Sequence, residues 1–141
     1  MIQNKRAHFD YQILEEFTGG LILKGSEVKS LRAGNANITE AYLYEKEGEI
    51  WITNMYIAKY TQAFYTNHEE RRERKLLLNK KEILYLKREL ETSGLTLVPI
   101  KIITTNNKFK LVFGLAKGKK NYDRRESIKE RDQIREIRRY V

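Results

Sequence analysis

The side chains of this sequence that could do chemistry are above all its cations. Lysine and arginine number 28 against 19 aspartates and glutamates, which gives a formal net charge of +9. The excess is uneven, because residues 108–141 hold 12 basic and 5 acidic side chains. A lysine or arginine placed on a phosphate releases condensed counterions, so this segment predicts binding to a polyanion. Charge alone leaves open a nucleic acid, a membrane surface and a merely solvated surface.

Few residues favour acid–base or metal chemistry. His8 and His68 could be the acid and base of a ribonuclease, but they stand sixty positions apart without a supporting motif. Glu27 has no second carboxylate or histidine near it in the sequence, so we expect it to contact a lysine or arginine of its own helix. The chain has no cysteine, which excludes a disulfide and a thiolate metal site. We therefore expect no metal and no cofactor.

Apolar alternation and turn signals predict three β-hairpins that would position these side chains. The hairpins cover residues 11–24 with a turn at Gly19-Gly20, 36–57 with a turn at Glu47-Gly48, and 95–115 with a turn at Asn106-Asn107. In the first hairpin, alternation is expected to place Tyr11, Ile13, Glu15 and Phe17 on one face. Pro99 has no N–H to donate and predicts a strand edge or a bulge.

Two helices are predicted between the hairpins. Ser26 can cap a short helix that Gly34 would end in the left-handed conformation. Asn79 is a good N-cap, with Glu82 three residues on as in a capping box, and apolar residues recur at helical spacing until Gly94. That second helix has one apolar stripe to bury.

Two stretches lack the pattern of a packed core. Residues 60–74 have no apolar period and are expected to form an exposed loop. Beyond Gly118 few residues are apolar. Ser127 and Glu130 make another capping box there, yet an isolated helix of about 13 residues is marginal in water. We expect a tail that is mobile when free and becomes helical against a partner.

The sequence therefore predicts a mainly β fold with external α-helices. Hairpins in succession favour an OB-like antiparallel β-barrel, followed by a flexible basic C-terminal tail. The expected domains are a barrel over residues 1–118 and a tail over residues 119–141. No apolar run approaches the roughly 20 residues needed to cross a bilayer, and residues 1–10 are polar rather than signal-like. We expect a cytoplasmic protein with no membrane partner.

Three long motifs follow one another along the chain. They are GSEVKSLRAG at residues 25–34, RKLLLN at residues 74–79, and LAKGKK with DRR and IKER between residues 115 and 131. In order and spacing these motifs resemble the SmpB (small protein B) family, whose members bind transfer-messenger RNA (tmRNA, or SsrA RNA). Residues 4–7 also resemble the family's opening segment, so the likeness covers nearly the whole chain.

The resemblance implies a function as well as the OB-like fold. Family members bind the tRNA-like domain of tmRNA, help deliver it to stalled ribosomes and so start trans-translation, the tagging of incomplete polypeptides. They are not enzymes. The implied partners are tmRNA and the ribosome, at the small-subunit decoding region and the vacant messenger channel, where the tail becomes helical. A monomer is expected.

The resemblance also implies two sets of site residues. The RNA-binding set is Lys5, Arg6, Tyr11, Thr18, Gly19, Lys75, Leu77, Asn79, Lys110 and Lys117. The ribosome-contacting tail set is Lys119, Lys120, Asp123, Arg124, Arg125, Ile128, Lys129 and Arg131. Taken without the resemblance, the cations of the first set are ordinary solvated side chains, Tyr11 is half core, Leu77 is core and Asn79 is a helix cap.

The chain departs from the family pattern at two places. Thr18 stands where the family commonly has an acidic residue, and His68-Glu69-Glu70 stands where it has an Asp-Pro or Glu-Pro step. Two other functions remain open. A generic OB-type RNA-binding or ribosome-associated protein would need the basic tail but not the three motifs, and a nuclease would need His8 or His68.

Overall fold

The computed structural model describes all residues except 1, 61–66, 93 and 119–141, so the expected tail lies outside the described residues. The elements in chain order are β1 (Ile2–Gln3), α1 (Ala7–Asp10), β2 (Tyr11–Leu21), α2 (Gly25–Arg32), β3 (Ala36–Asn37), β4 (Tyr42–Lys46), β5 (Glu49–Thr53), β6 (Tyr56–Ile57), β7 (Arg74–Leu77), α3 (Lys80–Leu90), β8 (Leu95–Thr105) and β9 (Lys108–Gly118).

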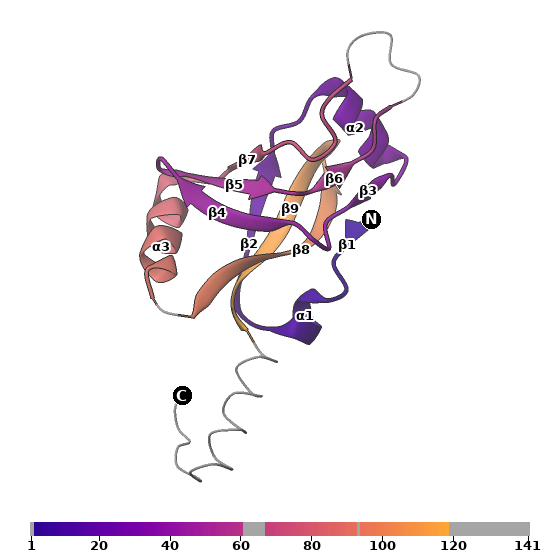
Figure 1. Cartoon of the computed structure of the whole chain (residues 1–141). Coiled ribbons are helices and arrows are strands. Elements are labelled where there is room, and N and C mark those ends of the chain that lie inside the picture. The colour runs from indigo at the N-terminus through magenta and orange to yellow at the C-terminus, as the bar shows by residue number, and fades with distance from the viewer. Residues whose placement is uncertain (1, 61–66, 93, 119–141) are drawn as a thin grey trace.

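The main sheet closes into a barrel. Its strand order is β1-β8-β4-β5-β7-β2-β9, and an additional pairing of β8 with β9 closes the ring, with β1 attached to β8. Every pairing is antiparallel. Figure 1 shows α3 on one side of this barrel and α2 on the other. The prediction of a mainly β, OB-like antiparallel barrel with external helices is confirmed.

The hairpin expected at Gly19-Gly20 is wrong, because β2 runs through both glycines as one strand. Gly20 pairs with Lys110 of β9 on one side and with Leu77 of β7 on the other. A Cβ added to Gly19 would lie 3.1 Å from Cδ2 of Leu78, so a glycine permits the close approach of the neighbouring chain. The glycine pair therefore serves strand packing rather than a turn.

A bulge in β2 also overturns the expected face of this strand. The register with β9 shifts between Ile13 and Glu15. Tyr11 and Ile13 consequently pack with Ala7 of α1 on the outside of the barrel, whereas Phe17 packs against the interior core. Glu15 is exposed. The four residues do not share one face, because one extra residue reverses the alternation.

The other two predicted hairpins form around turns with positive φ. Glu47 and Gly48 have φ of 55° and 79° between β4 and β5, and Asn106 and Asn107 have φ of 52° and 64° between β8 and β9. Such φ values are typical of the two-residue turns that match strand twist. The register of β8 with β9 shifts next to Pro99, as a bulge there predicts. The outer parts of the second hairpin, β3 and β6, pair separately.

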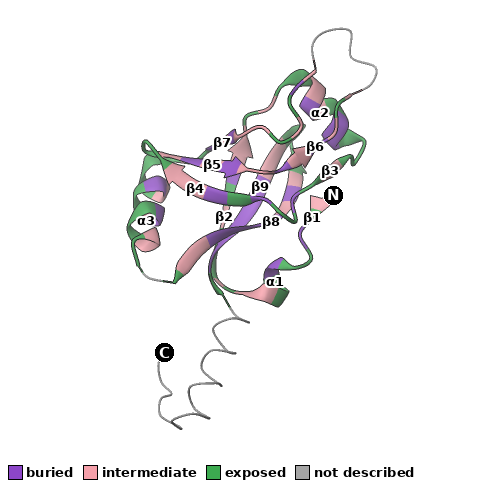
Figure 2. Ribbon diagram, viewed as in Figure 1, coloured by how far each residue is buried: buried purple, intermediate pink, exposed green. Residues whose placement is uncertain are grey.

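The core lies inside the barrel and under two helices. Figure 2 shows buried positions along the barrel strands and on one side of α3. Ile83 and Leu86 of α3 and Leu31 of α2 belong to the same buried cluster as Ile50, Leu76 and Phe113 of the strands. A second, smaller cluster under α1 covers the outside of β8 and β9. The helices thus cover apolar surface of the strands that would otherwise be exposed to solvent.

Local signals for the helices are mostly confirmed. Asn79 caps α3: its side chain accepts a hydrogen bond from the Glu82 N–H at 2.8 Å, and Glu82 accepts one from the Asn79 N–H at 3.3 Å. Gly34 has a positive φ after α2, as predicted, and Gly94, at the predicted end of the second helix, also has a positive φ. The N-cap of α2 is Lys24 instead of Ser26.

The expectation of an exposed loop over residues 60–74 is wrong for much of its described part. His68 is 2% exposed and Arg74 is fully buried at the start of β7. Both are polar, so the apolar periodicity on which the expectation rested could not detect their burial.

Candidate nucleic-acid interface

The outer face of β7, β2 and β9 brings together two predicted site residues. Leu77 and Lys110 both pair with Gly20, from opposite sides. Side chains alternate across a strand, and Leu76 and Leu111 are completely buried in the core. Leu77 and Lys110 therefore point outward, with only a glycine between them.

A groove of about 460 Å³ occupies this place. It is lined by Gly20, Leu21, Leu23, Val28, Leu77, Asn107, Lys108, Phe109 and Lys110. Leu77 is 61% exposed, so the reading of this residue as a core leucine is wrong. The groove combines an apolar floor with two ammonium groups, which suits a ligand with flat apolar parts and negative charge.

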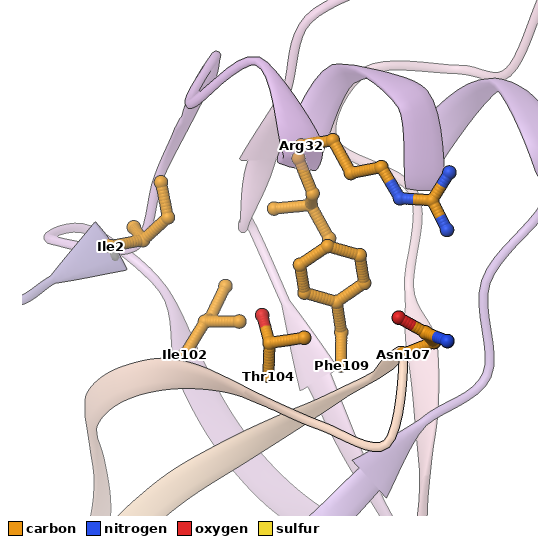
Figure 3. A pocket seen from close by; sticks show the side chains of 7 residues that line it. Ile2, Arg32, Ile102, Thr104, Asn107 and Phe109 are labelled. Atoms are coloured by element: carbon orange, nitrogen blue, oxygen red, sulfur yellow. The ribbon is translucent and has the colours of Figure 1, made fainter.

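A second hollow of about 220 Å³ continues around the β8–β9 turn. It shares Asn107 and Phe109 with the groove. Figure 3 shows Arg32 and Asn107 on one side of the Phe109 ring and Ile2 and Ile102 on the other. Arg32 of α2 therefore adds a third cation beside the same apolar floor.

Four more predicted residues lie near Gly20 and Leu77, namely Thr18, Gly19, Lys75 and Asn79. Thr18 precedes Gly19 on β2, and it pairs with Val112 of β9. Lys75 is in phase with Leu77 on the outer face of β7 and pairs with Trp51 of β5. We refer to six residues as the groove group: Thr18, Gly19, Lys75, Leu77, Asn79 and Lys110. Among the described residues, no salt bridge involves Lys75 or Lys110.

The remaining predicted residues lie toward the other end of β2. Tyr11 pairs with Gly118 there, next to Lys117. Arg6 stands at the start of α1, with its Nε 3.0 Å from Oδ2 of Asp10. We refer to Lys5, Arg6, Tyr11 and Lys117 as the β2-start group. At about 3.3 Å per residue, Tyr11 and Gly20 are about 30 Å apart along the strand. The structure does not bring the ten predicted residues into one site.

Sequence reasoning missed a buried ionic cluster that joins α2 to the start of β7 and to the residues just before it. We call Glu27, Arg72 and Arg74 the ionic joint. Both carboxylate oxygens of Glu27 accept hydrogen bonds from Arg72, at 2.7 and 3.0 Å, and Nε of Arg74 donates at 2.7 Å. The expected contact of Glu27 within its own helix is wrong. Arg74 stands in phase with the core residue Leu76, and this alternation was the signal that could have revealed its burial.

The environment of the ionic joint sets its charge state. Burial alone would raise the pKa of Glu27, but the hydrogen bonds from Arg72, the Lys24 N–H and Arg74 hold that pKa below its ordinary value. Burial lowers the pKa of the Arg74 guanidinium, whereas the nearby Glu27 carboxylate raises it, and the effect of burial is the larger of the two. Arg74 also donates to the carbonyl oxygens of Met55, at 2.6 Å, and Glu70, at 3.2 Å. The joint is a fully paired structural element.

His68 lies beside this joint and is not available for catalysis. Its Nε2 is 2.8 Å from the Ile57 carbonyl oxygen, so Nε2 carries the proton and donates it. Its Nδ1 then accepts a hydrogen bond from the Ser26 hydroxyl at 2.7 Å. His8 stands on α1, outside the barrel. The two histidines therefore do not form the acid–base pair that a nuclease would need.

The described residues form neither a metal site nor a membrane-spanning helix. No group of three or more histidine, cysteine, aspartate or glutamate side chains there could hold a metal ion. No helix of the described part is long and apolar enough to cross a membrane.

A closed antiparallel barrel, with outward lysines that form no salt bridge among the described residues beside an exposed groove, is the architecture of a small nucleic-acid-binding β-barrel protein. The family model described as SmpB protein matches residues 1–141. The chain belongs to the SmpB family.

Relatives with known names agree with this assignment. The SsrA-binding protein of Phocaeicola vulgatus is 50% identical over 137 residues, which cover 96% of this chain and 91% of the relative. The SsrA-binding protein of Wolbachia pipientis subsp. Culex pipiens is 52% identical over 135 residues, covering 95% and 91%. A chain from the solved structure "tmRNA-SmpB: a journey to the center of the bacterial ribosome" matches with a TM-score of 0.73 and 45% identity, covering 96% of this chain and 98% of that chain.

Proposed function

We propose that this protein binds the tRNA-like domain of tmRNA and promotes its delivery to stalled ribosomes for trans-translation. The observation that carries the proposal is the groove group, in which Lys75 and Lys110 face outward and form no salt bridge with any described residue. The relatives named SsrA-binding protein and the match to a tmRNA-SmpB structure support the same partner. They favour it over a generic RNA-binding barrel.

The positions of the cations favour recognition of RNA shape and backbone. Lys75, Lys110 and Arg32 come from two strands and a helix, not from one helix that could enter a groove and read bases. A folded RNA presents phosphates on a curved surface, which cations on several elements can follow. Binding should therefore select the tRNA-like fold over an unstructured strand.

The β2-start group extends the proposed interface. Arg6 keeps a side chain that is 60% exposed although it pairs with Asp10, and Lys117 ends the barrel on β9. Tyr11 is half-buried against the cluster under α1, so only part of its side chain is accessible to RNA. The two groups together would contact RNA over about 30 Å, which exceeds the length of one turn of an RNA double helix.

The proposed function is tested by binding at defined salt. The protein is titrated with folded tRNA-like RNA, an unstructured RNA of equal length and a duplex. The proposal expects tightest binding to the folded RNA, with log affinity falling by about 0.7 to 0.9 per phosphate neutralised as log salt rises. Equal affinity for all three RNAs would favour the generic barrel, and a flat salt response would exclude binding through phosphates. An RNA-cleavage assay on the same samples is expected to show no product.

The tail, residues 119–141, is proposed to act at the ribosome after RNA binding. It holds nine basic and five acidic side chains, and Ser127 with Glu130 can start a helix. Ordering a residue costs roughly 1 to 2 kcal/mol, which contacts with phosphates in the vacant messenger channel of the decoding region would offset. The proposed contacts are Lys119, Lys120, Asp123, Arg124, Arg125, Ile128, Lys129 and Arg131. A monomer in the cytoplasm suits this role.

The role of the tail is tested by measuring two activities separately. Ile128→Pro, which prevents the helix, and replacement of Asp123, Arg124 and Arg125 by alanine are each compared with the unchanged chain. Tagging of incomplete polypeptides should fall strongly, while affinity for tmRNA should stay within about twofold. Equal loss of both activities, or full tagging by both variants, would contradict this division.

A further inference from the structure

The outer face of β4, β5 and β7 carries a row of aromatic and basic side chains beside the groove. Tyr44, Trp51 and Lys75 are direct neighbours across the three strands. They alternate with the buried residues Leu43 and Ile50, so the row points outward. Tyr42, Tyr44, Lys46, Trp51 and Lys75 are called the platform below.

Two ammonium groups lie against the single indole ring of the platform. Nζ of Lys46 is 4.8 Å from the centre of the Trp51 ring and 5.9 Å from that of Tyr44. Nζ of Lys75 is 6.0 Å from the Trp51 ring. Lys46 also forms an exposed salt bridge of 2.9 Å with Glu73, so its charge is partly neutralised. The cationic character of the platform therefore rests mainly on Lys75.

This combination matches the chemistry of an unpaired nucleotide. A nucleobase stacks on an aromatic face, and an ammonium group close to that ring meets the phosphate. Tyr42, at one end of the platform, is 57% exposed. A protein partner would need acidic groups for Lys75 and an apolar surface for the rings, whereas RNA supplies both phosphates and π-faces on one chain.

Continuity with the groove identifies which RNA would occupy the platform. Lys75 stands between Trp51 on β5 and Ile22, whose N–H donates to the Lys75 carbonyl oxygen at 3.2 Å. Leu77, two residues further along the same face of β7, lines the groove. One lysine thus borders both surfaces, and an RNA backbone that reaches Lys75 from the groove continues over Trp51.

We propose that the platform stacks unpaired loop bases of the same RNA that occupies the groove. This inference rests on the proposed function, since the groove must hold a folded RNA with single-stranded loops. The platform adds base stacking to an interface that is otherwise electrostatic. The stacking contribution of its aromatic rings is consequently less dependent on salt than the contribution of Lys75 and Lys110.

The test uses the fact that Trp51 is the one tryptophan of the chain. Titration with folded tRNA-like RNA should quench its emission, with a midpoint equal to the dissociation constant from anisotropy of labelled RNA. Trp51→Leu should weaken binding about fivefold or more, as loss of one stacked base does. Trp51→Phe keeps a π-face and should recover most of that loss. Circular dichroism melts confirm that both variants fold.

A matched control is another aromatic ring with a cation above it. The guanidinium carbon of Arg71 lies 5.3 Å from the centre of the Tyr56 ring, away from the platform. Tyr56→Leu should bind RNA as the unchanged chain does. If Trp51→Leu and Tyr56→Leu bind equally well, or if Trp51 emission does not change on binding, the platform is not a stacking site.

Synthetic RNA with abasic loop nucleotides completes a double-mutant cycle. Removal of the loop bases should weaken binding to the unchanged chain and have little further effect on Trp51→Leu. Independent, additive losses would overturn the proposal. If Lys75→Ala and Lys110→Ala weaken binding while Trp51→Leu and abasic loops do not, the result supports the proposed function and contradicts base stacking on the platform. If the unchanged chain does not bind the tRNA-like RNA more tightly than the other RNAs, the proposed function is contradicted.

Discussion

Arg74 and Lys75 are neighbours in the chain, yet they meet opposite environments. Arg74 is fully buried in the ionic joint, where Glu27 and backbone carbonyl oxygens satisfy its guanidinium. Lys75 faces outward beside the groove and has no salt bridge among the described residues. Strand alternation alone separates the two. One cation holds α2 to the barrel, and the next remains available for phosphate.

The difference shows that the number of basic residues does not identify those that can bind RNA. What matters is whether each basic side chain already has a carboxylate as a counter-charge. A buried guanidinium pays a large desolvation cost, which only a nearby carboxylate and full hydrogen bonding repay. An outward lysine without a counter-charge keeps its charge for a ligand. The two regions should therefore respond to mutation in different measurements: the ionic joint in stability, and the groove group in RNA affinity.

The largest effect is expected from breaking the ionic joint. Glu27→Gln leaves two guanidinium groups without their carboxylate and should lower the free energy of unfolding by about 3 to 5 kcal/mol. Urea denaturation of the variant and of the unchanged chain measures this difference in the free energy of unfolding. The control is Glu40→Gln, which removes an exposed pair with Arg71 at 3.9 Å and should cost less than about 1 kcal/mol. Similar losses in both variants would contradict the structural role of the joint.

The same joint predicts a dependence of stability on pH. The folded chain holds the pKa of Glu27 below its ordinary value of 4.5. Its stabilising contribution is therefore complete above that value and is lost as the pH falls through the lowered folded pKa. The unchanged chain should lose stability on acidification more steeply than Glu27→Gln. Parallel curves from urea denaturation between pH 6 and pH 3 would show that Glu27 is not paired in the fold.

The next effect concerns the groove alone. Lys75→Ala with Lys110→Ala removes two phosphate contacts, so affinity for tRNA-like RNA should fall roughly tenfold or more at low salt and the salt dependence should flatten. The melting temperature should change little. Lys87→Ala with Lys101→Ala removes the same charge elsewhere and should leave affinity within about twofold. Equal losses in both pairs would indicate a non-specific charge effect.

A smaller effect is expected from filling the groove without changing charge. A Cβ on Gly20 would lie 3.6 Å from Cβ of Leu77, an ordinary contact, so Gly20→Ala should fold normally. Gly20→Val extends into the groove and should weaken RNA binding by about 1 kcal/mol, or fivefold. Gly25→Ala, where a Cβ meets nothing within 4 Å, is the control. Unchanged affinity of Gly20→Val would show that RNA does not enter the groove.

The smallest effect is expected from removal of the tail. A chain ending at Gly118 keeps every described strand and helix. Its thermal melt and its affinity for the tRNA-like RNA should stay near those of the full chain, within about twofold at 0.15 M salt. Aggregation or loss of a cooperative melt would show that residues 119–141 pack on the barrel.

Local chemistry explains which parts of the fold the sequence could predict. The Asn79 cap with Glu82 and the turn at Asn106-Asn107 depend on residues next to one another, and both are confirmed. The hairpin expected at Gly19-Gly20 is wrong because strand pairing with β7 and β9 decides the conformation there, and these partners are distant in sequence. Propensity could not reveal that choice.

The same distinction separates what could and could not be predicted of the site. The family resemblance implied Lys75, Leu77 and Lys110. The structure places Leu77 and Lys110 on either side of Gly20, and Lys75 two residues before Leu77 on the same face of β7. The partners of Glu27 come from 45 and 47 positions further along the chain. No local rule connects residues so far apart, so the ionic joint and the burial of His68 required the structure.

Hydroxyl-radical footprinting on complete tmRNA tests the central claim most directly. The claim is that the outward lysines of the groove, which form no salt bridge among the described residues, bind the tRNA-like domain, while the arginines paired with Glu27 hold the fold. The unchanged chain should protect the tRNA-like domain and leave the rest of the RNA open. Lys75→Ala with Lys110→Ala should lose most of that protection while melting at the same temperature. Protection spread over the whole RNA, or an unaltered footprint of the double variant, would contradict the account.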